Sequence, residues 1–284
     1  MSADNAAKRF ADTFNRHGYG LPQVVIDQIH NLFQETKAGW RFETVEFPVR
    51  VQDESTRIDI ILSGVRGSWL IVGECKRVNP AIGNWYFVRS RYVRRNHHEY
   101  YIAENAKMIE TSFFSDGLAI GQVSDEFYHI ALEVKTDADG DKSGGKDAIE
   151  DACGQVMKGV NGLIDSLRHN IPLLGASGAK VILPVIFTTA KLFAGEFDWK
   201  DVDGASGKVD ASKVRVTEKP YLFYQYPVSP GIRHSAISSE THSDFSAVMV
   251  ADHLRTIAVV SISGIATFFE RFHPLNFDIL KISP

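Results

Sequence analysis

The sequence predicts an α/β protein with a central mixed β-sheet flanked by helices. Short apolar runs rich in Val, Ile and Leu recur along the chain, as expected for buried strands. Two longer stretches, residues 22–38 and 147–169, instead repeat apolar residues at helical spacing. The 284 residues are 44% hydrophobic, which is enough for a sizeable core, and no glycine-serine or proline-rich linker divides them. We therefore expect one domain.

The N-terminal region predicts helices. Residues 1–17 are polar with sparse phenylalanines, which indicates a short helix or a frayed end. After a break at residues 18–22, a helix is expected to begin at Pro22, a favoured first helical residue, and to end before Gly39. Its apolar positions are Val25, Ile29, Leu32 and Phe33. This helix is expected to pack on the sheet.

Residues 40–51 alternate in hydropathy and predict the first strand. Its acids Glu43 and Glu46 are three positions apart, so they project from opposite faces of a strand. At most one of them can face a given site. Solvent exposure is the simpler expectation for both.

The chain is organised around a predicted hairpin of two apolar strands, residues 57–62 and 69–76, joined by a turn that contains two glycines. The first strand carries Asp59 and the second ends in Glu74 and Lys76, with one residue between them. Because alternate side chains of a strand share a face, Glu74 and Lys76 project together, and the hairpin places Asp59 beside them. Two carboxylates and an ammonium among apolar strands are costly to bury unless they pair or bind a cation.

Asp59, fourteen intervening residues and then Glu74-Cys75-Lys76 resemble the signature of the PD-(D/E)XK nucleases, with Ile58 where the motif's proline often stands. The order of elements over residues 18–80, one helix and then three strands, also resembles the core of restriction endonucleases. The motif is short, so the order of elements strengthens the resemblance.

The resemblance implies a restriction-endonuclease-like core at residues 18–200, with an insertion after the catalytic strand at about residues 81–145. Residues 1–17 would form an N-terminal segment. Residues 201–284 would form a C-terminal extension that packs on the same domain and widens its sheet.

The resemblance and the residue types together imply metal-dependent hydrolysis of phosphodiester bonds. Hard carboxylate ligands such as Asp59 and Glu74 suit Mg²⁺ or Mn²⁺, and the backbone carbonyl of Cys75 could complete the metal site. Lys76 would position the attacking water or stabilise the charge that develops on the phosphate. The structural alternative is a buried salt bridge between Lys76 and one of the acids. Buried ion pairs rarely add net stability, which disfavours that alternative.

Two further positions are assigned through the resemblance. Relatives often place a glutamate on the first helix, facing the metal, whereas here the same neighbourhood offers Gln23, Asp27 and Gln28. A second metal ion therefore lacks an evident ligand. Relatives also carry a polar residue on the helix after the catalytic lysine, and Gln155 is the catalytic candidate by position. An ordinary boundary glutamine is the alternative at Gln155.

The insertion opens with a stretch that mixes arginines and aromatic residues. Its candidate nucleic-acid-binding residues are Arg89, Arg91, Tyr92, Arg94 and Arg95, and its other aromatics are Tyr86, Phe87, Tyr100 and Tyr101. Arginines bind phosphates and aromatic faces stack on exposed bases, so the mixture favours one wall of a DNA cleft. A solvated helix face is the alternative.

Three other patterns in this region are weaker. The adjacent histidines of residues 97–98 diverge on any regular element, which disfavours a metal site built from both. Residues 140–147 nearly match a phosphate-binding P-loop, but Asp147 stands where Mg²⁺ needs a hydroxyl ligand. Residues 137–142 begin like an EF-hand loop, but Lys142 replaces the required glycine.

The rest of the chain predicts further strands and helices. We expect strands at residues 127–135, 180–188, 221–226 and 256–262, a loop at 197–216, and helices at 147–169 and 264–272. The longer helix carries an apolar stripe of Ile149, Ala152, Val156, Val160, Leu163 and Leu167. Because this helix precedes it, the strand at residues 180–188 is expected to cross over and pair within the core sheet.

Composition limits the partners and the compartment. A formal net charge of −4 argues against coating DNA by charge alone, so affinity for DNA would be local. Cys75 and Cys153 offer neither a disulfide framework nor zinc spacing, and no run of 18 apolar residues is present. We expect a cytoplasmic protein with no membrane partner, and a homodimer is compatible with the sequence.

The sequence thus predicts a metal-dependent DNA endonuclease, in a prokaryotic restriction, defence or repair setting. The alternative from another class is a catalytically inactive module that keeps the nuclease fold and binds nucleic acid. A P-loop-like nucleotide binder is less favoured.

Overall fold

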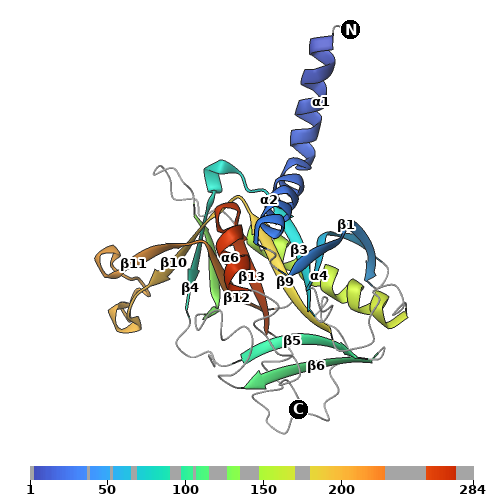
Figure 1. Ribbon diagram of the computed structural model, residues 1–284. Coiled ribbons are helices and arrows are strands. Elements are labelled where there is room, and N and C mark those ends of the chain that lie inside the picture. Colours follow the sequence, from blue (N-terminus) through green and yellow to red (C-terminus); the bar gives the residue numbers. More distant parts are fainter. Residues whose placement is uncertain are drawn as a thin grey trace.

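A mixed β-sheet forms the centre of the molecule, and helices cover both of its faces (Figure 1). The computed structural model describes residues 3–36, 39–51, 54–64, 69–89, 97–104, 107–114, 127–134, 147–169, 180–227 and 254–272. The predicted α/β class is confirmed in these residues.

Within the described residues the strands form a nine-stranded sheet and a four-stranded sheet. Across the larger sheet, neighbouring strands follow the order β1 (Trp40–Val51), β2 (Glu54–Gly64), β3 (Trp69–Lys76), β9 (Lys180–Thr188), β13 (Leu254–Ser261), β12 (Tyr221–Pro227) and β7 (Phe127–Tyr128). The pair β5 (His97–Glu104) and β6 (Lys107–Phe114) joins this sheet at β9. The smaller sheet has the order β11 (Arg215–Lys219), β10 (Lys191–Glu196), β4 (Asn84–Val88) and β8 (Ile130–Val134).

Each face of the larger sheet has its own core. The helices α2 (Gly20–Thr36) and α6 (Ile265–Arg271) cover one face, where Val25 and Phe269 are fully buried. The helix α4 (Asp147–His169) covers the other face, and its buried stripe includes Val156 and Val160. Trp85 and other apolar residues of the smaller sheet join the α4 core, so the two sheets share it.

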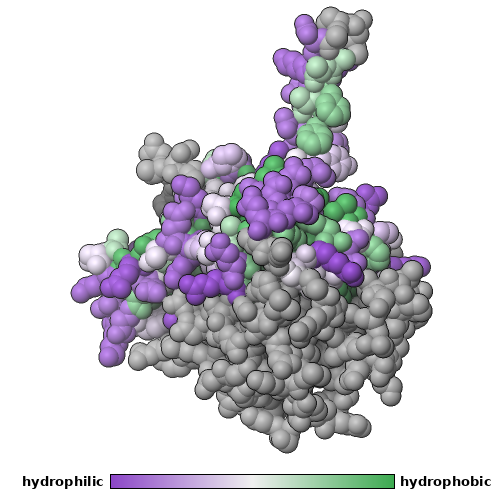
Figure 2. All heavy atoms as spheres, viewed as in Figure 1, coloured by the Kyte–Doolittle hydropathy of each residue, from purple (hydrophilic) through white to green (hydrophobic). Residues whose placement is uncertain are grey.

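The first helix, α1 (Ala3–His17), projects from the rest of the molecule (Figure 1). Of the two alternatives for residues 1–17, a short helix or a frayed end, it agrees with the helix. Its hydrophobic residues are visible along the rod in Figure 2, and Phe10 is 70% exposed. The rings of Phe10 and Phe14 stack with 5.8 Å between their centroids. None of the described helices has the length and apolar character that crossing a membrane requires.

Several predicted elements begin and end at the predicted residues, and the predicted crossover from the helix at 147–169 to the strand at 180–188 is confirmed. The strands at residues 40–51 and 180–188 and the helix at 147–169 have the predicted bounds. Strand β9 pairs in parallel with β3, so that Thr188 lies beside Lys76. This topology places the end of β3, where Glu74 and Lys76 lie, in the middle of the sheet with α4 above it.

The smaller sheet was not predicted. Residues 127–135 were expected to form one strand, but the chain leaves the larger sheet at His129, whose backbone N–H donates to the carbonyl of Val88 on β4 at 3.0 Å. Residues 130–134 then form β8 on the smaller sheet. The C-terminal part of the expected loop at 197–216 begins β11, whose residues are mostly exposed and therefore carry no apolar pattern.

Candidate active site

Asp59 and Glu74 lie opposite each other on the antiparallel strands β2 and β3. Ile60 pairs with Gly73, so the next pair along the hairpin is Asp59 with Glu74. The Asp59 carboxylate accepts a hydrogen bond from the backbone N–H of Cys75, with 2.7 Å between Oδ2 and N. This bond fixes Asp59 against the end of β3 and brings together the two acids that the sequence predicted.

Burial and neighbouring negative charges make both acids hard to ionise. Desolvation, followed by repulsion from Asp59, raises the pKa of Glu74 from its usual 4.5 to about 8, against the attraction of Lys76. Desolvation also raises the pKa of Asp59 from 3.8 to about 6, although the hydrogen bond from Cys75 favours its charged form. Two such carboxyls side by side are the arrangement that a bound cation relieves.

The side chains of Glu74 and Lys76 face α4. Val72, two residues before Glu74, packs in the core beneath α4, whereas Cys75 packs against the core of α2 and α6. The Lys76 ammonium lies 3.9 Å from the Asp151 carboxylate of α4, and its side chain is 22% exposed. In the described part of the chain, Lys76 therefore has its ion pair with Asp151, which the sequence did not suggest, and not with Asp59 or Glu74.

Glu46 of β1 belongs to the same row of acids. Val45 pairs with Ile60 and Phe47 with Ile58, so Glu46 stands opposite Asp59. After burial, the charge of Glu46 contributes to raising the pKa of Asp59. The predicted solvent exposure of Glu46 is confirmed, because its side chain is 42% exposed and contacts Arg57 at 3.4 Å. Its charge nevertheless acts on Asp59.

The backbone of Glu46 is unusual. Its φ is 51°, and it is the only non-glycine residue with positive φ in the part of the chain that the structure describes. A side chain in this region costs roughly 1–3 kcal/mol and persists only where the surroundings impose it. Strained backbone of this kind is often found at functional sites.

Gln155 lies on the strip of α4 that reaches the ends of β2 and β3. Asp151, Gln155 and Lys158 are spaced by four and three residues, so they share one side of the helix. Asp151 contacts Lys76, and the Lys158 ammonium contacts the Glu54 carboxylate at 2.7 Å. Gln155 is exposed between these two contacts. A role for Gln155 in the site stays a prediction.

Two glycines let α4 approach the sheet closely. A Cβ atom on Gly162 would lie 2.6 Å from the Cβ of Val49, and one on Gly159 would lie 3.0 Å from Cγ1 of Ile58. Both distances are below ordinary van der Waals contact. A side chain at either position would therefore clash with the sheet.

The remaining site candidates are placed as follows. Gln23, Asp27 and Gln28 are exposed on α2, which covers the sheet face opposite to Glu74 and Lys76. Arg89 is half-buried just after β4. The other candidate nucleic-acid-binding residues, Arg91, Tyr92, Arg94 and Arg95, lie outside the described residues, as do most of the P-loop-like and EF-hand-like patterns.

Two aromatic residues of β4, Trp85 and Phe87, are fully buried and cannot contact bases. Phe87 is fully buried in the core shared by the two sheets, and the Tyr86 ring stacks on Phe193 with 4.9 Å between centroids. The expectation that Phe87 helps to grip a nucleic acid is therefore wrong. Alternate residues of a strand that lies over a core must point inward.

The donor set suits one hard cation with an incomplete protein shell. Among the residues that the structure describes, no group of three or more His, Cys, Asp or Glu side chains is gathered tightly enough to hold a metal ion. Two carboxylates and a neighbouring carbonyl nevertheless fit Mg²⁺ or Mn²⁺, because Mg²⁺ in particular keeps several waters and binds through one or two protein carboxylates. The residues present therefore fit a single such ion at Asp59 and Glu74.

The titration of Glu74 predicts how stability depends on pH. Between about pH 4.5 and pH 8 the folded protein retains a proton on Glu74 that the unfolded chain has released. Because the unfolded state binds fewer protons, the free energy of unfolding should fall as the pH rises through this window, by at most about 1.4 kcal/mol per pH unit. Asp59 should add to the fall between about pH 4 and pH 6.

Urea unfolding with a chelator present tests this dependence. Glu74→Gln should remove most of the fall above pH 6 and should be more stable than the wild type at pH 8. Glu218→Gln on exposed β11 should keep the wild-type dependence. A wild-type stability that increases from pH 5 to pH 8 would contradict the burial and repulsion described for Glu74.

A comparison of the chain with protein-family models, curated proteins and solved structures finds no match.

Proposed function

We propose that this protein is a metal-dependent nuclease with a restriction-endonuclease-like core that hydrolyses phosphodiester bonds in DNA. The observation that carries the proposal is the pairing of Asp59 with Glu74 at the end of β3, next to Lys76, with both acids resisting ionisation. The setting we propose is prokaryotic restriction, defence or repair, in the cytoplasm.

Each residue of the site has a chemical role in this proposal. Asp59, Glu74 and the Cys75 carbonyl would hold the cation, which supplies charge neutralisation at the phosphate and makes water more acidic when bound. Lys76 would donate hydrogen bonds to the phosphate oxygens as negative charge develops on them. Its ion pair with the 67% exposed Asp151 is long, so Lys76 can turn to a substrate at little cost.

The alternative is a module that keeps this fold and binds nucleic acid without turnover. The observation that favours it is that the described residues gather only two carboxylates closely, with no tight group of three metal-ligating side chains. Both functions predict DNA binding, so affinity for DNA does not separate them. Metal binding does.

Titration with Mn²⁺ in a calorimeter at pH 8 is the test. The wild type should take up one Mn²⁺ and release protons, because the ligands must ionise to bind. Asp59→Asn should bind much more weakly, whereas Asp201→Asn, in an exposed turn, should behave like the wild type. Equal binding by wild type and Asp59→Asn would favour the inert module.

The basic stretch of the insertion should bind DNA phosphates. Replacing Arg91, Arg94 and Arg95 together by alanine should weaken binding to all DNA sequences alike. The slope of log K against log salt should decrease by about one unit for each arginine that binds a phosphate in the wild type. A matched replacement of Lys191, Lys200 and Lys208, all exposed, should leave that slope unchanged. An unaltered slope in the arginine variant would place the DNA-binding surface elsewhere.

A further inference from the structure

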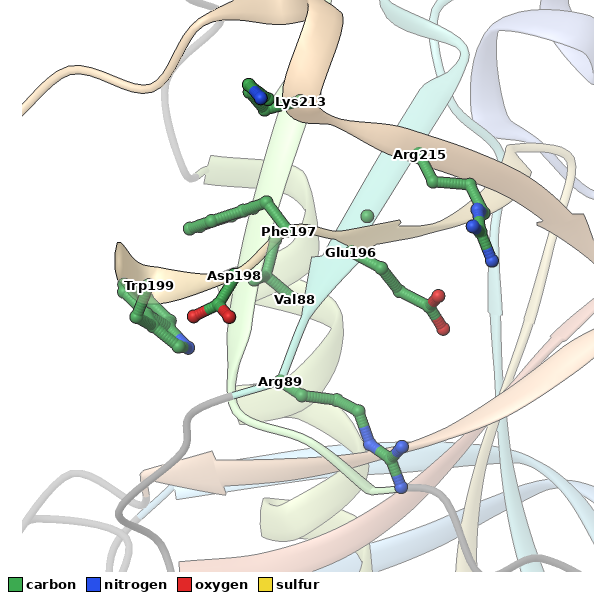
Figure 3. A pocket seen from close by; sticks show the side chains of 9 residues that line it. Val88, Arg89, Glu196, Phe197, Asp198, Trp199, Lys213 and Arg215 are labelled. Atoms are coloured by element: carbon green, nitrogen blue, oxygen red, sulfur yellow. The ribbon is translucent and has the colours of Figure 1, made fainter. Parts of the chain in front are cut away.

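A cavity of about 570 Å³ opens at the carboxyl ends of β4 and β10 on the smaller sheet. Its volume lies within the range of about 300–1,000 Å³ that is typical of small-ligand sites. Figure 3 shows Arg89, Glu196 and Arg215 on one side of it and Phe197, Asp198 and Trp199 on the other. One side of the cavity is therefore charged, and the other combines two aromatic rings with Asp198 and Lys213.

The walls of the cavity are held by regular structure. On one side, Val88 pairs with Gly195 and Glu196 pairs with Arg215, so the sheet ladder fixes the spacing of the charged residues. On the other side, Trp199 begins a short turn whose first backbone groups are capped by Asp198, with 3.0 Å from its Oδ1 to the backbone N of Lys200. Preformed walls lower the entropy cost of binding.

The chemistry of the two sides matches a nucleotide. The ring centroids of Phe197 and Trp199 lie 4.8 Å apart with the rings tilted by 59°, and Trp199 is 37% exposed, so its indole ring is accessible to an aromatic ligand in the cavity. Arg89 and Arg215 lie on the charged side, and either guanidinium can bind a phosphate. The half-buried Glu196 carboxylate can accept hydrogen bonds from an exocyclic amino group of a base.

The cavity is connected to the candidate active site through two neighbouring strands. Beyond Lys76 and Thr188 the chain continues from β3 into β4 and from β9 into β10, and both new strands again pair in parallel. The backbone N–H of Thr189 donates to the carbonyl of Lys76 at 3.3 Å, and the backbone N–H of Lys191 donates to the carbonyl of Gly83 at 2.8 Å. The two sites therefore lie at the carboxyl ends of two successive parallel strand pairs, β3 with β9 and β4 with β10.

We propose that this cavity binds one unstacked nucleotide of the DNA substrate, with its base against Trp199 and Phe197 and its phosphate at the arginines. This inference rests on the proposed nuclease function and adds a substrate feature to it: recognition of an extruded or single-stranded base. Glu196 restricts the base to adenine, cytosine or guanine, which carry an amino group, and disfavours thymine.

The test measures binding of single-stranded oligonucleotides of adenine, cytosine or thymine to Glu74→Gln protein in a chelator, so that no cleavage occurs. Trp199→Ala added to this background should weaken binding of the adenine and cytosine oligonucleotides about 5- to 150-fold. Trp199→Phe should retain most of the affinity, because stacking is preserved. Lys200→Ala, next to Trp199 but not in the cavity wall, is the control and should bind as the parent does.

The outcomes separate this inference from the proposed function. Glu196→Gln should reduce the preference for adenine and cytosine over thymine, and Arg89→Ala should lower the salt slope by about one unit. If Trp199→Ala binds every oligonucleotide as tightly as its parent while wild type cleaves DNA with Mn²⁺, the cavity proposal is wrong and the nuclease stands. If the wild type cleaves no DNA but Trp199→Ala still weakens oligonucleotide binding, the cavity proposal is supported and the nuclease proposal is wrong. No binding by any variant overturns the cavity proposal.

Discussion

Glu74→Gln should abolish DNA cleavage while leaving the protein folded. The substitution keeps the shape of the side chain but removes the negative charge that would hold the metal ion. Loss of one such electrostatic contributor typically costs about 10²- to 10³-fold in rate, and loss of the metal should cost at least that. Burial makes the ionisation of Glu74 unfavourable in the folded protein. The melting temperature of the variant at pH 8 should therefore be no lower than that of the wild type.

Lys76→Met and Asp59→Asn complete this experiment. Both should reduce cleavage to a similar extent, but only Asp59→Asn should also weaken Mn²⁺ binding, since Lys76 stabilises the substrate charge and does not hold the ion. Glu218→Gln provides a matched control on an exposed strand and should cleave at the wild-type rate. Full activity in either Lys76→Met or Asp59→Asn would remove that residue from the site.

Gly264→Ala should destabilise the fold strongly, because the turn between β13 and α6 has no room for a side chain. A Cβ atom at this position would lie 1.9 Å from the carbonyl oxygen of Pro220. That oxygen already accepts hydrogen bonds from the backbone N–H of Ser261 at 3.1 Å and from its hydroxyl at 3.0 Å, so it cannot move away freely. We expect the free energy of unfolding to fall by about 2–4 kcal/mol.

Urea unfolding measures this decrease, and Gly204→Ala is the control. A Cβ atom on Gly204 would have nothing within 4 Å, so its substitution should change stability by no more than about 0.5 kcal/mol. Equal stabilities for the two variants would mean that the turn between β13 and α6 adapts more easily than its hydrogen bonds imply.

The elements with strong periodicity were predictable from sequence. The strand at 180–188 and the helix at 147–169 have the predicted bounds, because each buries an apolar face that leaves a clear pattern. The hairpin of β2 and β3 also follows from sequence. It brings Asp59 opposite Glu74. The centre of the candidate site could therefore be predicted from the position of the turn and the alternation of side chains along the two strands.

The parts that depend on long-range packing were not predictable. Glu46 lies beside Asp59 because of the register in which β1 pairs with β2, where Val51 is opposite Glu54. Five positions further from the turn, the same register brings Glu46 opposite Asp59. Asp151 reaches Lys76 because of how α4 lies on the sheet, which no local pattern encodes. The smaller sheet was missed because exposed β11 has no apolar alternation.

Incubation of the purified protein with DNA and Mn²⁺ at pH 8 tests the central claim most directly. Duplex, single-stranded, branched and modified DNA should all be offered, with Glu74→Gln in parallel. We predict cleavage of at least one form by the wild type, none by Glu74→Gln, and complete loss of activity when a chelator is added. Wild-type protein that takes up Mn²⁺ yet cuts none of these substrates, or cleavage that survives in Glu74→Gln, would contradict a nuclease centre at Asp59, Glu74 and Lys76.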